Sequence, residues 1–152
     1  MEKEHTDEVK FEYNQITENI YIGTNVCCKT HFDNKLLKNG ITADISIEGE
    51  RVDTPFGVEF FLWIPVVDTE PPTQDQLILG VSMLKKSVLL NKKVYVHCRR
   101  GHGRAPTVVA AYFISEGYSV EDAIEKIKEK RPVIHLNDPQ VSALKTFQDN
   151  KQ

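Results

Sequence analysis

The 152-residue chain has only three cysteines, and none of its apolar stretches is long. Three is an odd number, and Cys27 and Cys28 are adjacent, so a secreted disulfide framework is not indicated. A cytoplasmic location with free thiols is therefore expected. The longest apolar run covers residues 108–114, which is too short to cross a bilayer, so no transmembrane segment is predicted. Residues 1–14 are too charged for the core of a signal peptide.

Positive charge is also scarce. Nineteen lysines and arginines against 22 acidic residues leave a net charge of -3, which argues against a nucleic-acid partner. The apolar content of 40% and charged content of 27% are typical of a folded domain and exclude general disorder. Only five residues are arginines, and three of them fall within residues 99–104. The low overall charge therefore leaves room for a small basic pocket.

No repeat or linker divides the sequence. We expect residues 1–10 to be a flexible arm and residues 11–152 to form one domain. Clusters of β-branched and aromatic residues predict strands at 20–22, 41–47, 58–66 and 93–97. Apolar periodicity and capping residues predict helices at 30–39, 73–90, 106–115 and 119–130, and a last one capped by Asp138. This order indicates an α/β fold, in which helices cover both faces of a central mixed sheet.

The junction between the strand at 93–97 and the next helix carries the strongest chemical signal. Residues 97–104 read HCRRGHGR. Backbone N–H groups of such a turn and the following helix N-terminus bind an oxyanion. Glycines let the backbone approach the ligand closely, and Arg104 offers a planar fork for two phosphoryl oxygens. The predicted phosphate-binding residues are Arg99, Arg100, Gly101, His102, Gly103 and Arg104.

Cys98 lies at the base of this predicted cradle. Helix N-termini and neighbouring cations lower the pKa of a cysteine thiol, so we predict a thiolate at neutral pH. A thiolate beside a bound phosphoryl group is suited to covalent phosphoryl transfer. The plainer alternative is a small buried cysteine next to a surface arginine, although the glycine and histidine spacing disfavours it.

The segment His97–Arg104 matches the HCxxGxxR signature of cysteine-dependent protein tyrosine phosphatases. The chain resembles their small dual-specificity branch from about residue 16 to residue 147, including the segments IPVVD at 64–68 and RPVIHLND at 131–138. The resemblance implies that Cys98 is the nucleophile and that Arg104 binds phosphate. It also implies that His97 orients Cys98 and that Asn137 braces the site. His97 could instead be an ordinary buried strand residue.

The predicted reaction needs an acid, because the leaving oxygen requires a proton when Cys98 displaces it. Asp68 precedes Cys98 by 30 residues, and the resemblance implies that an aspartate at this place is the general acid and then the base. A turn-forming role is the alternative interpretation of Asp68. Glu70 and Asp75 are the substitute candidates, although an acid in the first turn of a helix, such as Asp75, is expected in any case.

One residue departs from the family pattern. Ala105 stands where a serine or threonine normally helps the thiolate to leave, so we expect slower hydrolysis of the intermediate, and nothing in the sequence shows that Thr107 compensates. No metal or other cofactor is predicted. A metal site could be assembled from Cys27, Cys28, His31, Cys98 and His102, but adjacent cysteines suit tetrahedral zinc poorly.

The sequence thus predicts a phosphatase of phosphotyrosine and phosphoserine or phosphothreonine, with phosphorylated proteins as partners. Two alternatives stay open. The segments PTQDQLILGV, KVYVHC and VVAAYFI resemble mitochondrial phosphatidylglycerophosphate phosphatases of the same branch, which implies a phospholipid or small phosphomonoester as substrate. Ala105 leaves room for a slow module that binds phosphoproteins.

Overall fold

A five-stranded mixed sheet lies at the centre of the protein, in the order β1-β2-β5-β3-β4. The computed structural model describes residues 8–150. The strands are β1 (Tyr13–Gln15), β2 (Ile20–Gly23), β3 (Ile41–Glu48), β4 (Phe60–Val66) and β5 (Lys93–His97). Only the pairing of β1 with β2 is antiparallel; the other three pairings are parallel. The carboxyl ends of β2, β3, β4 and β5 therefore lie at one edge, where ligands of such sheets bind.

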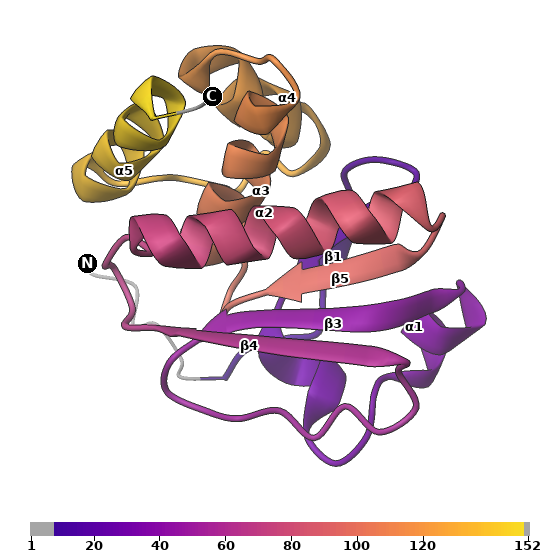
Figure 1. Ribbon diagram of the computed structural model, residues 1–152. Helices are drawn as coiled ribbons and strands as arrows, with labels where there is room; N and C mark the ends of the chain where they lie inside the picture. The colour runs from indigo at the N-terminus through magenta and orange to yellow at the C-terminus, as the bar shows by residue number, and fades with distance from the viewer. Residues whose placement is uncertain (1–7, 151–152) are drawn as a thin grey trace.

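Helices cover both faces of this sheet, as predicted. They are α1 (Asn34–Lys38), α2 (Gln74–Leu89), α3 (Arg104–Ser115), α4 (Val120–Lys130) and α5 (Asp138–Asp149), and a short 3₁₀ helix, η1, spans Asn25–Cys28. The four long helices lie on one side of the sheet, and α1 lies on the other (Figure 1). Within residues 8–150, no helix combines the length and apolar character needed to cross a membrane.

Most predicted elements are confirmed, and the differences have local causes. Strand β5 has the predicted bounds, and Thr73 and Gln76 cap α2 reciprocally, as expected. The predicted helix at 30–39 shrinks to five residues, because Asp33 caps it late. Helix α5 is capped by Asn137 rather than by Asp138, so the predicted cap is wrong by one residue. β1 and η1 were not predicted, since three or four residues give little periodic signal.

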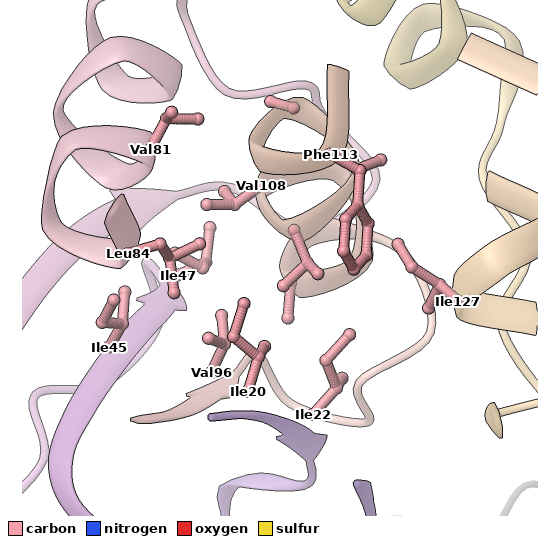
Figure 2. Packing of buried hydrophobic residues seen from close by; sticks show 14 of the residues in the cluster. Ile20, Ile22, Ile45, Ile47, Val81, Leu84, Val96, Val108, Phe113 and Ile127 are labelled. Carbon is pink, nitrogen blue, oxygen red and sulfur yellow. The ribbon is translucent and has the colours of Figure 1, made fainter. Parts of the chain in front are cut away.

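Side chains alternate between the two faces of the central strands. Ile20, Ile22, Ile45, Ile47 and Val96 point toward the long helices and pack against residues of α2, α3 and α4 (Figure 2). Helix α3 is apolar on nearly all sides because it lies between the sheet and the other helices, as its sequence predicts. Burial of this cluster fixes where α3 begins, and with it the loop that precedes the helix.

The far face of the sheet holds a smaller core, built from η1, α1 and the aromatic rings of Tyr21, Phe32 and Tyr95. It also buries polar residues in a row along β3: Asp44, Ser46 and Glu48. Cys27 and Cys28 lie in this core and are joined by a disulfide, so the expectation of three free thiols is wrong. Cys98 is the one free cysteine in the described part of the chain.

The predicted arm falls mainly outside the described residues, which exclude 1–7. At the end of that arm, the carbonyl of Lys10 accepts a hydrogen bond of 3.0 Å from the hydroxyl of Thr24. This contact places the chain before β1 against the segment that follows β2.

Candidate active site

A pocket of about 240 Å³ opens at the carboxyl edge of the sheet. It gathers most of the predicted site residues, although they come from segments far apart in the chain. Its walls are formed by Asp68, Thr69, Cys98, Arg99, Arg100, His102, Gly103, Arg104, His135, Asn137 and Gln140. Glu70 and Asp75, the substitute acids, are not among these lining residues, and His97 lies on the far face of the sheet.

The phosphate loop, residues 98–104, connects β5 to α3 and depends on Gly101. This residue has a φ of +70°, which a residue with a side chain rarely adopts. A Cβ atom there would lie 2.6 Å from the carbonyl oxygen of Gly23 and 2.9 Å from Nη2 of Arg131. The sequence therefore needs glycine at this place for both backbone conformation and space.

The Arg104 side chain is only 2% exposed, and its two terminal nitrogens, Nη1 and Nη2, are held by hydrogen bonds. Nη1 donates to Oε1 of Glu50 (2.5 Å) and to the carbonyl of Val66 (2.7 Å), while Nη2 donates to Oε2 of Glu50 (3.1 Å). Nε, in contrast, is buried and has no hydrogen-bond partner among the described residues. A buried donor without an acceptor is costly, so this edge of the guanidinium is suited to an incoming oxyanion.

Glu50 was not predicted from the sequence. It lies just beyond β3, and its side chain is 44% exposed. Its two carboxylate oxygens accept hydrogen bonds from Nη1 and Nη2 of Arg104, and Nε does not take part in this pairing. No motif marks Glu50 in a single sequence, because the pairing depends on how β3 and α3 meet.

Asp68 also lines the pocket, from the loop after β4. Its side chain is 66% exposed, and Oδ1 lies 3.5 Å from Nη2 of Arg104. The same oxygen accepts from the backbone N–H of Thr69, which has a positive φ of 69°. Asp68 can therefore exchange protons with solvent and reach a group bound at Arg104.

Asn137 joins this acid-bearing loop to helix α5. Its amide Nδ2 donates to the carbonyl of Thr69 (2.7 Å), and its Oδ1 accepts from the backbone N–H of Gln140 (3.0 Å). The side chain thus both caps α5 and holds the loop that contains Asp68. The bracing role that the resemblance implies for Asn137 stays a prediction.

Arg131, a second buried arginine, supports the phosphate loop from behind. Its side chain is 0% exposed. Nε donates to the carbonyl of Gly101 (2.9 Å), and Nη2 donates to the carbonyl of Arg100 (2.8 Å). The remaining donors reach Asn14 (2.8 Å) and Glu12 (2.5 Å). Turning two loop carbonyls toward Arg131 helps the loop N–H groups to face the pocket. The sequence motif contained Arg131, but its role was not predicted.

The rim of the pocket is polar. Arg99, Arg100 and His102 line it, and the ring of His102 lies 5.3 Å from that of His135, centroid to centroid. Burial, followed by the charge of Arg131, lowers the pKa of His102 below its usual value. The positive charge at the rim is therefore carried by arginines rather than by His102.

Ala105 is completely buried at the start of α3. Thr107, the nearby hydroxyl considered as a replacement for the missing serine or threonine, donates to the carbonyl of Gly103 at 2.7 Å. Its single proton is thus engaged within the helix. The expectation of slower hydrolysis stays a prediction.

His97 occupies a buried polar cluster on the far face of the sheet. Its Nε2 lies 2.6 Å from Oδ2 of Asp53 and 3.1 Å from Oδ1 of Asp44, and its Nδ1 lies 3.3 Å from the carbonyl oxygen of Cys98. Burial disfavours the imidazolium, but the charge and hydrogen bonds of the two aspartates outweigh it and raise the pKa of His97 to about 10. Burial raises the pKa of Asp44 to about 7.

The suggested metal set does not form, because Cys98 and His102 line the pocket while Cys27 and Cys28 lie on the far face. A different set offers one candidate ligand atom each within 4.8 Å: Cys27, Cys28, Asp44, Asp53 and His97. Both sulfurs are joined to each other, and Nε2 of His97 is in hydrogen-bond contact with Asp53. As it stands, this arrangement is a hydrogen-bonded cluster, since a metal-bound Nε2 could carry no proton.

Residues 20–150 match the family model described as "Dual specificity phosphatase, catalytic domain". The chain is similar to the human phosphatidylglycerophosphatase and protein-tyrosine phosphatase 1, with 40% identity over 92 residues, which cover 60% of this chain and 46% of that protein. The chain thus spans less than half the length of that relative.

Two further similarities extend over nearly the whole chain. A putative tyrosine phosphatase, 123R of invertebrate iridescent virus 6, is 30% identical over 139 residues, covering 90% of this chain and 92% of the viral protein. The crystal structure of PTPMT1 superposes with a TM-score of 0.76 at 31% identity, covering 91% of this chain and 94% of that one.

Proposed function

The chain belongs to the dual specificity phosphatase family, and we propose that it hydrolyses phosphotyrosine and phosphoserine or phosphothreonine in proteins. It is a cysteine-dependent phosphatase of that type. The observation that carries the proposed site is the buried Nε of Arg104, which has no hydrogen-bond partner within residues 8–150 and lies in a pocket that Cys98 and Asp68 also line.

The first step is transfer of the phosphoryl group to the enzyme. Loop N–H groups and the Nε edge of Arg104 hold the phosphoryl oxygens and stabilise the charge that spreads over them in the transition state. The thiolate of Cys98 forms a bond to phosphorus while the bond from phosphorus to the ester oxygen breaks. Protonated Asp68 gives its proton to that leaving oxygen.

The second step is hydrolysis of the cysteinyl-phosphate. Asp68, now a carboxylate, takes a proton from a water molecule as the water oxygen bonds to phosphorus. The bond between sulfur and phosphorus breaks, and the thiolate of Cys98 and inorganic phosphate are released. The exposure of Asp68 suits both steps, because the acid must regain a proton from solvent in each cycle.

Protein substrates are supported by an accessible pocket with a polar and basic rim. Arg99 and Arg100 line the opening, so acidic residues near the phosphorylated side chain are favoured. No tyrosine, phenylalanine or tryptophan of the described chain is among the lining residues. The lining therefore does not favour phosphotyrosine over phosphoserine or phosphothreonine. The similarity to the putative viral tyrosine phosphatase spans nearly all of both chains.

A phospholipid phosphatase is the second candidate. It is supported by the 40% identity to the human phosphatidylglycerophosphatase and protein-tyrosine phosphatase 1, and by the polar rim, which also suits a glycerol headgroup. A slow phosphoprotein-binding module is the third candidate, and it rests on Ala105 alone.

One substrate panel tests these proposals. Hydrolysis of a small aryl phosphate, phosphopeptides and phosphatidylglycerophosphate vesicles is compared for the unmodified chain, Cys98→Ser and Asp68→Asn. We expect the phosphopeptides to give the highest kcat/KM, and Cys98→Ser to remove all activity. Asp68→Asn should lower kcat by about 10²-fold, because the leaving oxygen then receives no proton from this side chain.

The other outcomes separate the alternatives. Preference for the vesicles would favour the lipid phosphatase. A cysteinyl-phosphate that accumulates without phosphate release would favour the binding module.

A further inference from the structure

His97 lies outside the substrate pocket, on the opposite face of the sheet from the long helices, yet it directly precedes the nucleophile. Its side chain is 0% exposed. The disulfide sulfur of Cys28, from η1, lies 3.6 Å from Nε2 of His97. The charged and titratable groups around the ring are Asp44 and Glu48 from β3, Arg51 and Asp53 from the loop after β3, and Tyr95 and Cys98 along its own strand and loop. The ring therefore lies in a closed polar environment.

Both ring nitrogens of His97 face acceptors. Nδ1 lies 3.3 Å from the carbonyl oxygen of Cys98, and a carbonyl oxygen can only accept. Nε2 lies 2.6 Å from the Asp53 carboxylate and 3.1 Å from that of Asp44. A neutral imidazole has one donor and one acceptor, whereas the imidazolium has two donors. The geometry therefore matches a ring that carries both protons.

We propose that Asp44 and Asp53 are positioning residues for the phosphatase reaction. They hold His97 as a buried imidazolium whose Nδ1–H anchors the carbonyl of Cys98 and so fixes the nucleophile at the base of the phosphate loop. The proposal rests on the cysteine-dependent phosphatase activity, and it assigns a function to two carboxylates that do not touch the pocket. Asp53 is the principal partner, because its contact with Nε2 is the shorter one.

Through this hydrogen bond the ring acts on the backbone of Cys98 and so on the position of its side chain. Without a carboxylate partner, burial would drive His97 to its neutral form, and Nδ1 could then turn from donor to acceptor. Loss of Asp53 would thus weaken both the anchoring of the Cys98 carbonyl and the local positive charge.

The direct test is the protonation state of His97. We expect side-chain ¹⁵N NMR of the histidine-labelled protein at about pH 8 to show both ring nitrogens of His97 protonated, although free histidine is largely neutral there. The resonances are assigned by their displacement in Asp53→Asn. A single protonated nitrogen at that pH would overturn the proposal, and this result does not depend on any activity.

The kinetic test uses Asp53→Asn, with Glu48→Gln as the matched control. Glu48 is an equally buried carboxylate on the same face, but its hydrogen bond goes to Asn25 rather than to His97. We expect Asp53→Asn to lower kcat on the order of tenfold with little change in KM, because a displaced nucleophile leaves phosphate binding intact. Equal losses in both variants, or a loss confined to KM, would contradict the proposal.

A double mutant shows whether Asp53 acts through His97. We expect Asp53→Asn to cause no further loss of kcat in a His97→Asn background, since the group through which it acts is gone. Multiplicative losses would mean an independent role for Asp53 and would refute the assignment. Should Asp53→Asn fail to fold, Asp44→Asn and the NMR measurement on the unmodified chain carry the same test.

Metal content provides the last check, because the same cluster presents metal-ligating atoms. We expect elemental analysis of reduced protein, equilibrated with zinc and then desalted, to find far less than one zinc per chain. Stoichiometric zinc would overturn the imidazolium assignment, since a metal on Nε2 displaces its proton.

Discussion

The phosphate loop has a working side, which faces the pocket, and a supporting side, which faces Arg131 and His97. The two sides differ in whether the donor groups next to the loop already have hydrogen-bond partners. On the pocket side, Nε of Arg104 is buried without a hydrogen-bond partner in the described part of the chain, and the side chain of Asp68 is 66% exposed. On the supporting side, Arg131 donates to two loop carbonyls, and both ring nitrogens of His97 contact acceptors. On the pocket side a donor is therefore left for the substrate, whereas the donors of Arg131 and His97 that support the loop are already engaged.

This difference shows how a loop of backbone donors can be kept ready for an anion. Backbone N–H groups that all point toward one spot repel each other electrostatically. The carbonyl groups of the loop therefore need strong hydrogen-bond donors elsewhere in the protein. Arg131 and His97 provide these contacts at the carbonyls of residues 98, 100 and 101. Substitutions on the two sides should therefore have distinguishable effects.

The largest effect is expected on the working side. Arg104→Lys keeps the charge but removes the planar fork, so we expect kcat/KM for an aryl phosphate to fall on the order of 10³-fold. Steady-state kinetics measure this. Arg100→Lys, in the same loop, is the matched control. Its kcat/KM should fall less than about threefold, because residue 100 contributes to phosphate binding through its backbone N–H. Similar losses in both variants would remove the special role of Arg104.

The next effect comes from the supporting side. Arg131→Met leaves the carbonyls of Arg100 and Gly101 without their donor, and we expect kcat/KM to fall about 10²-fold. The free energy of unfolding should drop by about 2 kcal/mol, as denaturant titration would measure, because buried acceptors are left unpaired. Lys130→Met, at the adjacent exposed position, should change neither quantity. Full activity in Arg131→Met would show that the phosphate loop keeps its conformation without Arg131.

Glu50 tests the boundary between the two sides, because it holds Arg104 from the solvent end. Glu50→Gln should lower kcat/KM roughly five- to tenfold, since the fork of Arg104 loses a charged anchor. The inhibition constant of inorganic phosphate should rise in parallel. Glu70→Gln, an acid outside the pocket lining, is the control. Tighter phosphate binding in Glu50→Gln would mean that Glu50 competes with substrate rather than positioning Arg104.

The smallest effect is a pH dependence of stability. The pKa of His97 in the folded protein is raised to about 10, above its value in the unfolded chain. Its contribution to stability is therefore complete below about pH 6.5 and is lost as the pH rises through the folded pKa. Between about pH 7 and pH 10, the Tm of the unmodified chain should fall at least about 3 °C further than that of His97→Gln. Parallel curves would contradict the buried imidazolium.

Local sequence signals accounted for much of the fold. The capping box of Thr73 and Gln76 gave the start of α2, and the apolar run of KVYVH gave β5. Gly101 and Gly103 could both be named as residues able to take a positive φ in this loop, but only the structure shows that Gly101 takes it. Signals spanning only one turn were less exact, as the shift of the α5 cap from Asp138 to Asn137 shows. Asp and Asn cap helices about equally well, so composition alone could not decide between them.

The sequence by itself determined the chemistry, because it contains a thiol, a glycine and an arginine at fixed spacing. One strand, one turn and one helix are enough to bring these three groups together. Only the tertiary structure decided what holds these groups. Glu50, Asp44 and Asp53 come from β3 and its following loop, and Arg131 comes from the end of α4. Glu50 and Arg131 contact the phosphate loop, and Asp44 and Asp53 contact His97 beside it, each across 30 or more residues of sequence. Such contacts depend on how sheet and helices pack, and a single sequence carries no periodic or capping signal for them.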